Sequence, residues 1–310
     1  YILMCCWSPP AYLKSDNSIA TGSGTLAKKA DGSYMYEEYA DWWIRALKYY
    51  MSYGIQVDYV SIQNEVDFAP DDYEGCLFAP KESDSKASYA KAFLAVYKAL
   101  REEFGDDAPK MLGPETMSCA PGTLVSYTSD IRNENPEALA GVAYHLYVGG
   151  TSDSSSNTVK PNTYMTNFTG IKDSFAAVKR WETEFYVGRG IQTAELIHFA
   201  LTYADMNAYL YWSGVWDDST PDRFESADLI EVNSSGEWRP SANYYAIRHF
   251  SQFVRPGYVR VDARSGETAV RASAFVSPYK DKLAAIQKFL IPFILLNTNK
   301  YNITLNKFNI

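Results

Sequence analysis

Two glutamates of this sequence directly follow strand-like stretches and are candidates for acid–base or nucleophilic chemistry. Glu65 comes after the stretch 59–63 and next to Asn64, and Glu184 ends the segment 179–184. Cleavage of a glycosidic bond needs one carboxylic acid for the leaving oxygen and a second carboxylate as nucleophile or base. An amide such as that of Asn64 can donate to a sugar 2-hydroxyl. Because the two glutamates lie far apart in the sequence, only the folded chain can bring them together.

The elements that must position these glutamates alternate between strand and helix patterns. Apolar strand-like runs occupy 2–7, 55–63, 110–115, 139–147, 181–185 and 207–216, and helical spacing marks 39–50, 89–104, 124–131, 171–180, 193–206 and 242–254. Asp84 or Ser85 is expected to cap the second helix. Regular alternation of this kind favours a parallel sheet with crossover helices.

A (β/α)8 TIM barrel explains where the polar and aromatic residues lie. They gather after the carboxyl ends of the strands, which is the face that holds the active site in such barrels. An open doubly wound sheet is the alternative, but it usually has a glycine-rich phosphate loop after its first strand. The nearest candidate, 22–27, follows no clear strand. The residues after strand ends are Trp7, Asn64, Glu65, Glu115, His145, Tyr147, Glu184, Trp212 and Trp216.

The chain divides into three parts by pattern. Residues 1–253 carry the six strand and helix units and are expected to form an incomplete (β/α)8 catalytic barrel. From 254 to 288 a period-two pattern with turn residues predicts a partial β-sandwich side domain. The asparagine-rich tail 289–310 is atypical, and with a start inside an apolar run at Tyr1 it indicates a truncated or frame-shifted fragment.

Composition excludes several classes of protein. The formal net charge of −8 argues against nucleic acid and anionic membranes as partners. The 25 Tyr and 7 Trp are typical of sugar-binding grooves as well as of cores. Four cysteines form no CxxC pair and the three histidines lie far apart, so we expect no metal site. No nucleotide motif stands out, and we expect no cofactor.

An ordered set of motifs resembles glycoside hydrolase family 30. The motifs are WSPPAYLK (7–14), SIQNEVDF (61–68), GPE (113–115), YHLY (144–147), WETEF (181–185), NAYLYW (207–212) and FVRPGYVRVDA (253–263). The resemblance implies a (β/α)8 barrel with a side β-domain, of which this chain carries barrel strands three to eight. It also implies Glu65 as acid/base and Glu184 as nucleophile. It also implies a secreted enzyme, expected to be a monomer, that acts on a polysaccharide.

Within that family the chain looks most like the subfamily 8 xylanases. Members that select glucuronoxylan hold the glucuronate branch through a Tyr, matched here by Tyr186, and an Arg after the eighth strand. The Arg position falls in 213–222, where no Arg occurs and Asp217 and Asp218 would repel a uronate. We therefore expect an endo-β-1,4-xylanase that does not require the branch. Further expected sugar contacts are Trp7, Asn64, His145, Tyr147, Trp212 and Trp216.

Two alternatives remain open at the sequence level. One is another hydrolase of the same family, such as a β-1,6-glucanase, a β-1,6-galactanase or a glucosylceramidase-like enzyme. The other is an inactive carbohydrate-binding fragment that keeps its aromatic residues but does not hold both glutamates in register.

Overall fold

The structure divides into two compact units. It is a computed structural model that describes residues 1–20, 22–150, 152–153, 158–186, 190–218, 228–267, 270–289 and 303–305. The first unit comprises Tyr1–Gly149 and Thr169–Glu184, and the second comprises Gly150–Phe168 and Phe185–Ile310.

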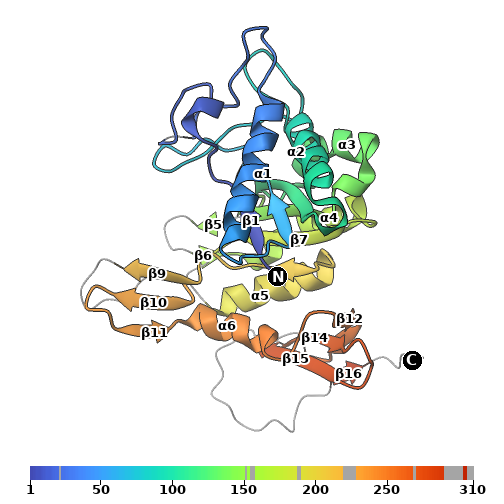
Figure 1. Ribbon diagram of the computed structural model, residues 1–310. Coiled ribbons are helices and arrows are strands. Elements are labelled where there is room, and N and C mark those ends of the chain that lie inside the picture. Colours follow the sequence, from blue (N-terminus) through green and yellow to red (C-terminus); the bar gives the residue numbers. More distant parts are fainter. Residues whose placement is uncertain are drawn as a thin grey trace. The chain divides into compact units, whose positions relative to one another are not determined.

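The first unit is built on parallel strands with helices on their outer side (Figure 1). The strands pair in the order β1-β2-β3-β4-β7, and the helices α1, α2 and α3 pack side by side. Strand, helix and strand therefore repeat as the sequence predicts, which is the pattern of a (β/α)8 barrel, here incomplete. The elements are β1 (Leu3–Cys5), α1 (Tyr36–Ser52), β2 (Tyr59–Ser61), α2 (Tyr89–Phe104), β3 (Lys110–Ser118), α3 (Pro121–Glu134), β4 (Gly141–Val148) and β7 (Lys179–Glu184).

Local sequence signals explain the ends of these helices. Helix α2 is capped by Ser88, whose hydroxyl accepts from the backbone N–H of Lys91, so the predicted caps Asp84 and Ser85 are wrong. Gly105 follows this helix at a φ of +57°, a conformation that glycine tolerates best. The helix predicted at 171–180 is also displaced, because α4 (Met165–Ser174) ends earlier, a turn follows at 175–178 and β7 begins at Lys179.

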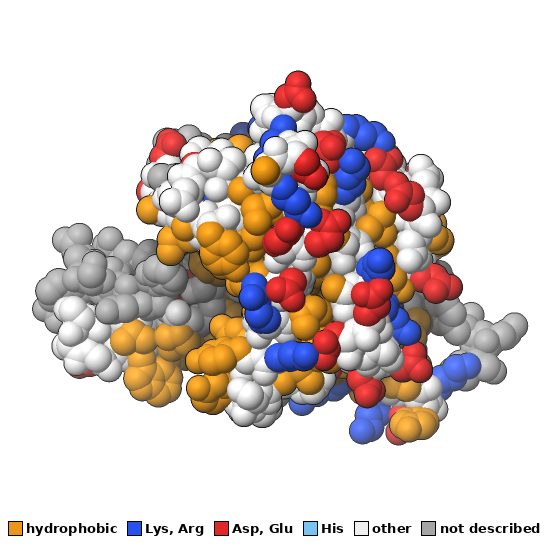
Figure 2. Space-filling view, turned by 45° about the horizontal axis from the view of Figure 1, so that its top comes forward, with side chains coloured by type: hydrophobic (Ala, Val, Ile, Leu, Met, Phe, Trp, Pro, Cys, Tyr) orange, Lys and Arg blue, Asp and Glu red, His pale blue; other side chains and the backbone are white. Residues whose placement is uncertain are grey.

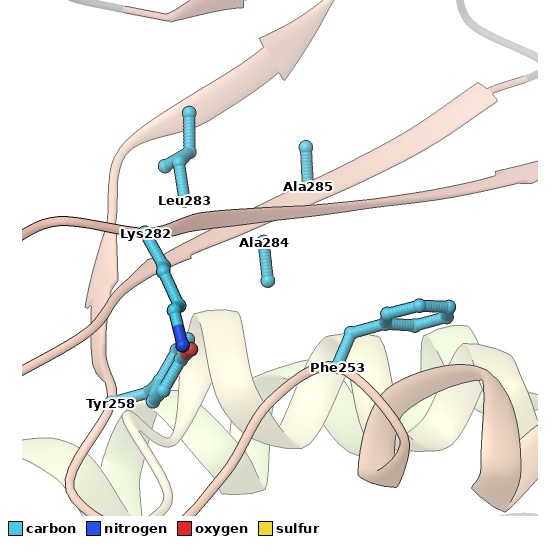
Figure 3. A pocket seen from close by; sticks show the side chains of 6 residues that line it. All are labelled: Phe253, Tyr258, Lys282, Leu283, Ala284 and Ala285. Atoms are coloured by element: carbon cyan, nitrogen blue, oxygen red, sulfur yellow. The ribbon is translucent and has the colours of Figure 1, made fainter.

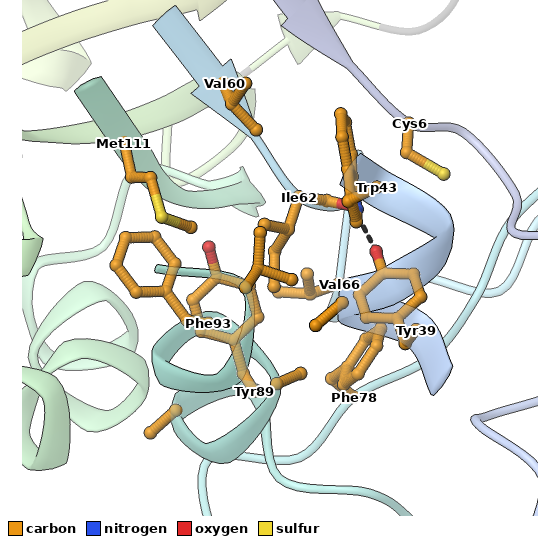
Figure 4. Packing of buried hydrophobic residues seen from close by; sticks show 14 of the residues in the cluster. Cys6, Tyr39, Trp43, Val60, Ile62, Val66, Phe78, Tyr89, Phe93 and Met111 are labelled. Carbon is orange, nitrogen blue, oxygen red and sulfur yellow. Dashed lines mark hydrogen bonds between the residues drawn. The ribbon is translucent and has the colours of Figure 1, made fainter. Parts of the chain in front are cut away.

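The outer face of the sheet carries an apolar core (Figure 4). Val60 and Met111 point from β2 and β3 toward Trp43 of α1 and Phe93 of α2, and all four side chains are almost fully buried. The hydroxyl of Tyr39 donates to the carbonyl of Ile62, so a buried polar group is satisfied at the strand end. This layer fixes the helices against the strands.

The inner face of the same strands begins with a second apolar layer. Tyr59, Leu112 and Ala143 are buried there, with Leu3 and Trp181 packed against them. Strand side chains alternate between the two faces, so the residues two positions further along β1, β4 and β7 lie above this layer. Those residues are Cys5, His145 and Thr183.

The second unit combines helices with small antiparallel and mixed sheets. Strand β14 pairs with β12 and β15, β10 lies between β9 and β11, and β13 pairs with β16. The elements are β5 (Ser152–Asp153), β6 (Thr158–Val159), α5 (Gly190–Tyr203), β8 (Ala208–Tyr209), β9 (Val215–Asp218), β10 (Ile230–Asn233), β11 (Trp238–Pro240), α6 (Ala242–Ser251), β12 (Val259–Val261), β13 (Ala263–Ser265), β14 (Val270–Val276), β15 (Leu283–Phe289) and β16 (Ile303–Leu305). The predicted boundary at 253/254 stays a prediction, and most of the tail 289–310 lies outside the described residues.

Charged side chains of both signs are interspersed on the face drawn in Figure 2. Lys29–Glu37 and Lys48–Glu103 are examples of ion pairs between partly exposed side chains. Among the described residues, none of the helices combines the length and the apolar character needed to cross a bilayer.

Candidate active site

The candidate catalytic side chains are aimed by two irregularities in the strand ladder. On β3, Glu115 is an extra residue between the partners of Ala143 and Tyr144. On β7, Thr183 is an extra residue between the partners of Tyr144 and His145, which places Glu184 opposite His145. Bulges of this kind are common next to active sites because they redirect side chains. Here they bring carboxylates from two strands to the face that His145 occupies.

Glu65 is held by its backbone as well as by its side chain. Its φ is +46°, and its N–H donates to the carbonyl of Glu115 over 2.8 Å. A non-glycine residue in the left-handed region costs on the order of 1–3 kcal/mol and persists only where its surroundings enforce it. Its Oε2 accepts a hydrogen bond of 2.7 Å from the hydroxyl of Tyr73. The carboxylate is thus buried, oriented and 3 % exposed.

His145 of β4 lies between three carboxylates. Its Nδ1 is 3.1 Å from Oε1 of Glu65 and 3.9 Å from Oε1 of Glu184, and its Nε2 is 3.0 Å from Oε2 of Glu115. Because ionised carboxylates only accept hydrogen bonds, both ring nitrogens act as donors and the ring is an imidazolium. Burial alone would lower the pKa of His145, but the hydrogen bonds to Glu115 and Glu65 outweigh burial and raise it to about 10.

Glu184 completes the cluster opposite Glu65. Its Oε1 accepts from the hydroxyl of Tyr147 over 3.1 Å, and one oxygen of Glu184 lies within 4.8 Å of one oxygen of Glu65. Two carboxyl groups about 5–5.5 Å apart are typical of retaining glycosidases, whereas inverting enzymes separate them by about 6.5–9.5 Å. The approach of one oxygen of each group to within 4.8 Å is thus nearer to the retaining than to the inverting arrangement.

Burial and charge set the protonation of this pair. Burial raises the pKa of Glu184 to about 7, the positive charge of His145 opposes this rise, and the negative charge of Glu65 adds to it. Near neutral pH Glu184 is thus close to half ionised. Two carboxylates at this distance titrate as a pair, because the charge on one disfavours charge on the other.

Glu65, His145 and Glu184 also offer ligand atoms within 4.8 Å of one another, a spacing that a metal ion can span. A metal ligand must use a neutral imidazole nitrogen. Both nitrogens of His145 instead donate to carboxylates, so an ion would have to displace a firmly held proton.

The structure brings some of the other expected sugar contacts to the same place. Trp7 lies beside Tyr73, with ring centroids 5.3 Å apart, and Tyr73 in turn contacts Glu65. Asn64 is buried next to Glu65, and its backbone N–H donates to the carbonyl of Cys6. A side-chain amide of Gln63 fixes the same loop by donating to the carbonyl of Trp7 over 2.6 Å.

The remaining expected contacts belong to the second unit. Tyr186 is 44 % exposed, and Trp212 is half-buried with its backbone N–H donating to the carbonyl of Phe185. Trp216 lies on β9, but its side chain is outside the described residues. For all three, contact with a sugar stays a prediction.

Sequence reasoning missed two participants. Tyr73 and Thr183 were not expected in the site, and Glu115 was expected only as one of the residues that follow a strand end. Thr183 donates to Oε2 of Glu115 over 2.5 Å, which is the oxygen that also faces His145. The bulges that place Glu115 and Thr183 leave no local sequence signal, and Tyr73 comes from a long loop whose path no periodicity predicts.

The second unit contains a hollow of about 450 Å³ (Figure 3). Phe253 and Tyr258 line it from the segment after α6, and 282–285 line it from the beginning of β15. Its lining offers one amine, one phenol hydroxyl and apolar groups, without the paired carboxylates of the first unit. The hydrolytic chemistry considered for this chain therefore belongs to the cluster around His145.

Comparisons with known proteins support the resemblance seen in the motifs. No protein-family model matches the chain. A Caenorhabditis elegans protein named as a glucosylceramidase is 24% identical over 294 residues, which cover 89% of this chain and 53% of that protein. Glucuronoxylanase XynC of Bacillus subtilis is 25% identical over 297 residues, which cover 91% of this chain and 59% of XynC. The chain thus spans somewhat more than half the length of these relatives.

Solved structures share the fold. The catalytic domain of GH30 xylanase C from Talaromyces cellulolyticus has a TM-score of 0.67 at 22% identity, over 90% of this chain and 61% of that one. Xyn30A of Clostridium acetobutylicum, a family 30 subfamily 8 xylanase, has a TM-score of 0.62 at 24% identity, over 89% and 61%. The predicted fold class is confirmed by these likenesses. They also confirm that this chain is similar to enzymes of glycoside hydrolase family 30, xylanases of subfamily 8 among them.

Proposed function

We propose that this chain carries the active site of a retaining glycoside hydrolase, with Glu184 as nucleophile and Glu65 as general acid/base. The observation that carries the proposal is the approach of the two carboxylates to within 4.8 Å on one face of the sheet. The similarity to family 30 enzymes is consistent with it.

The proposed reaction has two steps. Ionised Glu184 attacks the anomeric carbon and forms a glycosyl ester while Glu65 transfers its proton to the departing oxygen. Ionised Glu65 then takes a proton from water, whose oxygen attacks the same carbon and releases Glu184. Each step leaves the other carboxylate in the state that the next step needs, and no outside co-reactant beyond water is consumed.

Two groups next to Glu184 favour its role as nucleophile against the effect of burial, which raises its pKa to about 7. The hydroxyl of Tyr147 and the charge of His145 favour the ionised form of Glu184, which is the form that attacks. Asn64 is proposed to bind the sugar 2-hydroxyl, and Trp7 to stack on a sugar ring. Tyr186, Trp212 and Trp216 are proposed as further sugar contacts.

We propose a xylan backbone as the substrate, cleaved as an endo-β-1,4-xylanase without need for a glucuronate branch. Xylanases among the relatives and structural neighbours support xylan. Independence from the branch rests on the sequence of 213–222, which contains Asp217 and Asp218 and no arginine. A secreted monomer that needs no cofactor remains part of this proposal.

Relatives with other substrates supply a second candidate activity. The Caenorhabditis elegans protein carries a glucosylceramidase name, and the endo-β-1,6-glucanase BT3312 shares the fold with a TM-score of 0.67 at 19% identity. The same carboxylate pair serves these substrates, so the site chemistry alone does not choose among them. A β-1,6-galactanase and a carbohydrate binder without turnover are the remaining alternatives.

A substrate panel tests the choice. We expect the purified chain to release reducing ends from unbranched β-1,4-xylan at an initial rate similar to that on glucuronoxylan, and to leave β-1,6-glucan and glucosylceramide intact. An absolute need for glucuronate would contradict the proposed specificity. Retention on xylan without turnover would identify a binder instead.

A covalent trap tests the roles of the two glutamates. An activated 2-fluoro-xylobioside should accumulate as an ester on the peptide that contains Glu184, seen by mass spectrometry. Glu184→Gln should abolish labelling, while Glu65→Gln should keep it, because an activated leaving group needs no acid. Glu103→Gln, a surface change, is the matched control. Label on Glu65 would reverse the proposed assignment.

A further inference from the structure

Glu115 belongs to a closed ring of contacts that includes Glu65. Its carbonyl accepts from the backbone N–H of Glu65, and its carboxylate faces Nε2 of His145. The other nitrogen of the same imidazole faces the carboxylate of Glu65. Backbone and side chain thus tie Glu65 to Glu115 by two separate routes, and both residues have a positive φ, +46° and +60°.

We propose that Glu115 is a positioning residue, which holds His145 as an imidazolium that aims its Nδ1–H at the carboxylates of Glu65 and Glu184. The proposal rests on the proposed function, because it assigns a role within that site. Glu115 acts through His145 and is not proposed to touch the sugar.

The contacts of Glu115 favour an indirect role. The side chain is 2 % exposed, and its Oε2 receives both His145 and the hydroxyl of Thr183. Its Oε1 is buried and makes no hydrogen bond among the described residues. A carboxylate enclosed in this way is out of reach of a sugar, but it is well placed to fix the ring orientation of the histidine.

Several other charged or titratable groups surround His145. Among them, Glu115 is the carboxylate best placed to stabilise the positive charge of the imidazolium. Glu65 follows β2, Glu184 ends β7, Tyr147 lies on β4 itself, and Asp67 acts from the loop after β2. From β1, Cys5 lies near Glu115 and Glu184. In the proposed reaction Glu65 and Glu184 exchange protons or form bonds, whereas Glu115 takes part in neither step. Its carboxyl group therefore keeps its contact with Nε2 and holds the ring in place through both steps.

The substitution Glu115→Gln keeps the shape and removes this charge. The amide oxygen can still accept from Nε2–H, but it no longer opposes loss of the Nδ1 proton. We expect His145 to become neutral within the range pH 5–9, with Nδ1 turned from donor to acceptor. The kcat should fall on the order of 10²-fold with little change in KM, because the loss concerns proton placement rather than sugar binding.

Nitrogen NMR of histidine-labelled protein tests the proposal directly. The chain has three histidines, so few signals need assignment. The two ring-nitrogen signals of His145 are those that disappear in His145→Asn. In the unaltered protein we expect both nitrogens of His145 to stay protonated from pH 5 to 9. In Glu115→Gln the ring should lose a proton in that range. A ring of the unaltered protein that titrates near its ordinary pKa would overturn the proposal without any variant.

Asp67→Asn is the matched control. It removes a nearby half-buried carboxylate that accepts from the backbone N–H of Met117 over 2.8 Å and, among the described residues, makes no hydrogen bond to the imidazole. We expect His145 to stay charged in this variant. Equal behaviour of Asp67→Asn and Glu115→Gln would contradict a specific role for Glu115. Loss of the His145 charge in Glu115→Gln, together with no hydrolysis by the unaltered chain on any substrate, would support the positioning and reject the proposed function.

Discussion

Two layers on the inner face of the same strands differ sharply in how they are held. The lower layer is apolar and contains Tyr59, Leu112 and Ala143. The upper layer contains His145 and its carboxylates, within a few residues along the same strands. Regular period-two pairing positions the lower layer, whereas bulges and positive φ values position the upper one.

The difference teaches where stability and chemistry come from. Burial of apolar side chains stabilises the fold, at about 25 cal/mol per Å² removed from water. Buried charges instead carry a desolvation cost that their partners only partly offset. The upper layer is therefore expected to cost stability and to exist because the lower layer and the outer core can support it.

The largest expected effect is on the apolar layer. Leu112→Ala should lower the free energy of unfolding by about 2–5 kcal/mol, since it opens a cavity in a fully buried position. Chemical denaturation measures this change. Activity per folded molecule should stay near its original value, and a loss of activity without a loss of stability would break the distinction between the layers.

The charged layer should respond in the opposite direction. Glu184→Gln should raise the free energy of unfolding at pH 8 by about 1–3 kcal/mol, because it removes a buried carboxylate. The pKa of Glu184 is raised from 4.5 to about 7, so the cost is absent below pH 4.5 and complete above about 7. The difference in melting temperature between pH 4.5 and pH 8 should thus be larger for the original chain than for the variant. A variant less stable at pH 8 would contradict this interpretation.

The pH dependence of activity should follow the ionisation of Glu184. If Glu184 is the nucleophile, kcat/KM should fall about tenfold per pH unit below pH 7, as Glu184 gains a proton. The Glu65→Gln variant can be assayed with an aryl xyloside that needs no acid. In this variant the acidic limb of the pH profile should move to lower pH, because the loss of one negative neighbour lowers the pKa of Glu184. A limb that does not move would show that Glu65 does not influence Glu184.

The smallest effect is expected at an exposed ion pair. Nζ of Lys48 lies 2.5 Å from Oε1 of Glu103, but the two side chains are 52% and 37% exposed. Lys48→Met should change the free energy of unfolding by less than about 1 kcal/mol, and added salt should reduce even that. A larger change would mean that surface charges matter as much as the buried ones.

Periodicity in the sequence predicted the regular parts of the first unit. Alternating patterns predicted its strands and helices, and polar residues at strand ends predicted that Glu65, His145 and Glu184 meet. The sequence did not predict that Thr183 and Glu115 are extra residues in the ladder, because a bulge depends on the pairing of two strands. The cap of α2 was misplaced for a similar reason, since Asp84, Ser85 and Ser88 are all suitable types and only the loop path selects one.

The two bulges have a consequence for the register of the sheet. If Thr183 paired with His145 in an even ladder, alternation would turn Glu184 toward the helices. If Glu115 paired with Tyr144 in the same way, its side chain would turn away from His145. The same sequence with regular pairing would have no working pair of carboxylates, so the one extra residue in each of β3 and β7 is itself part of the proposed catalyst.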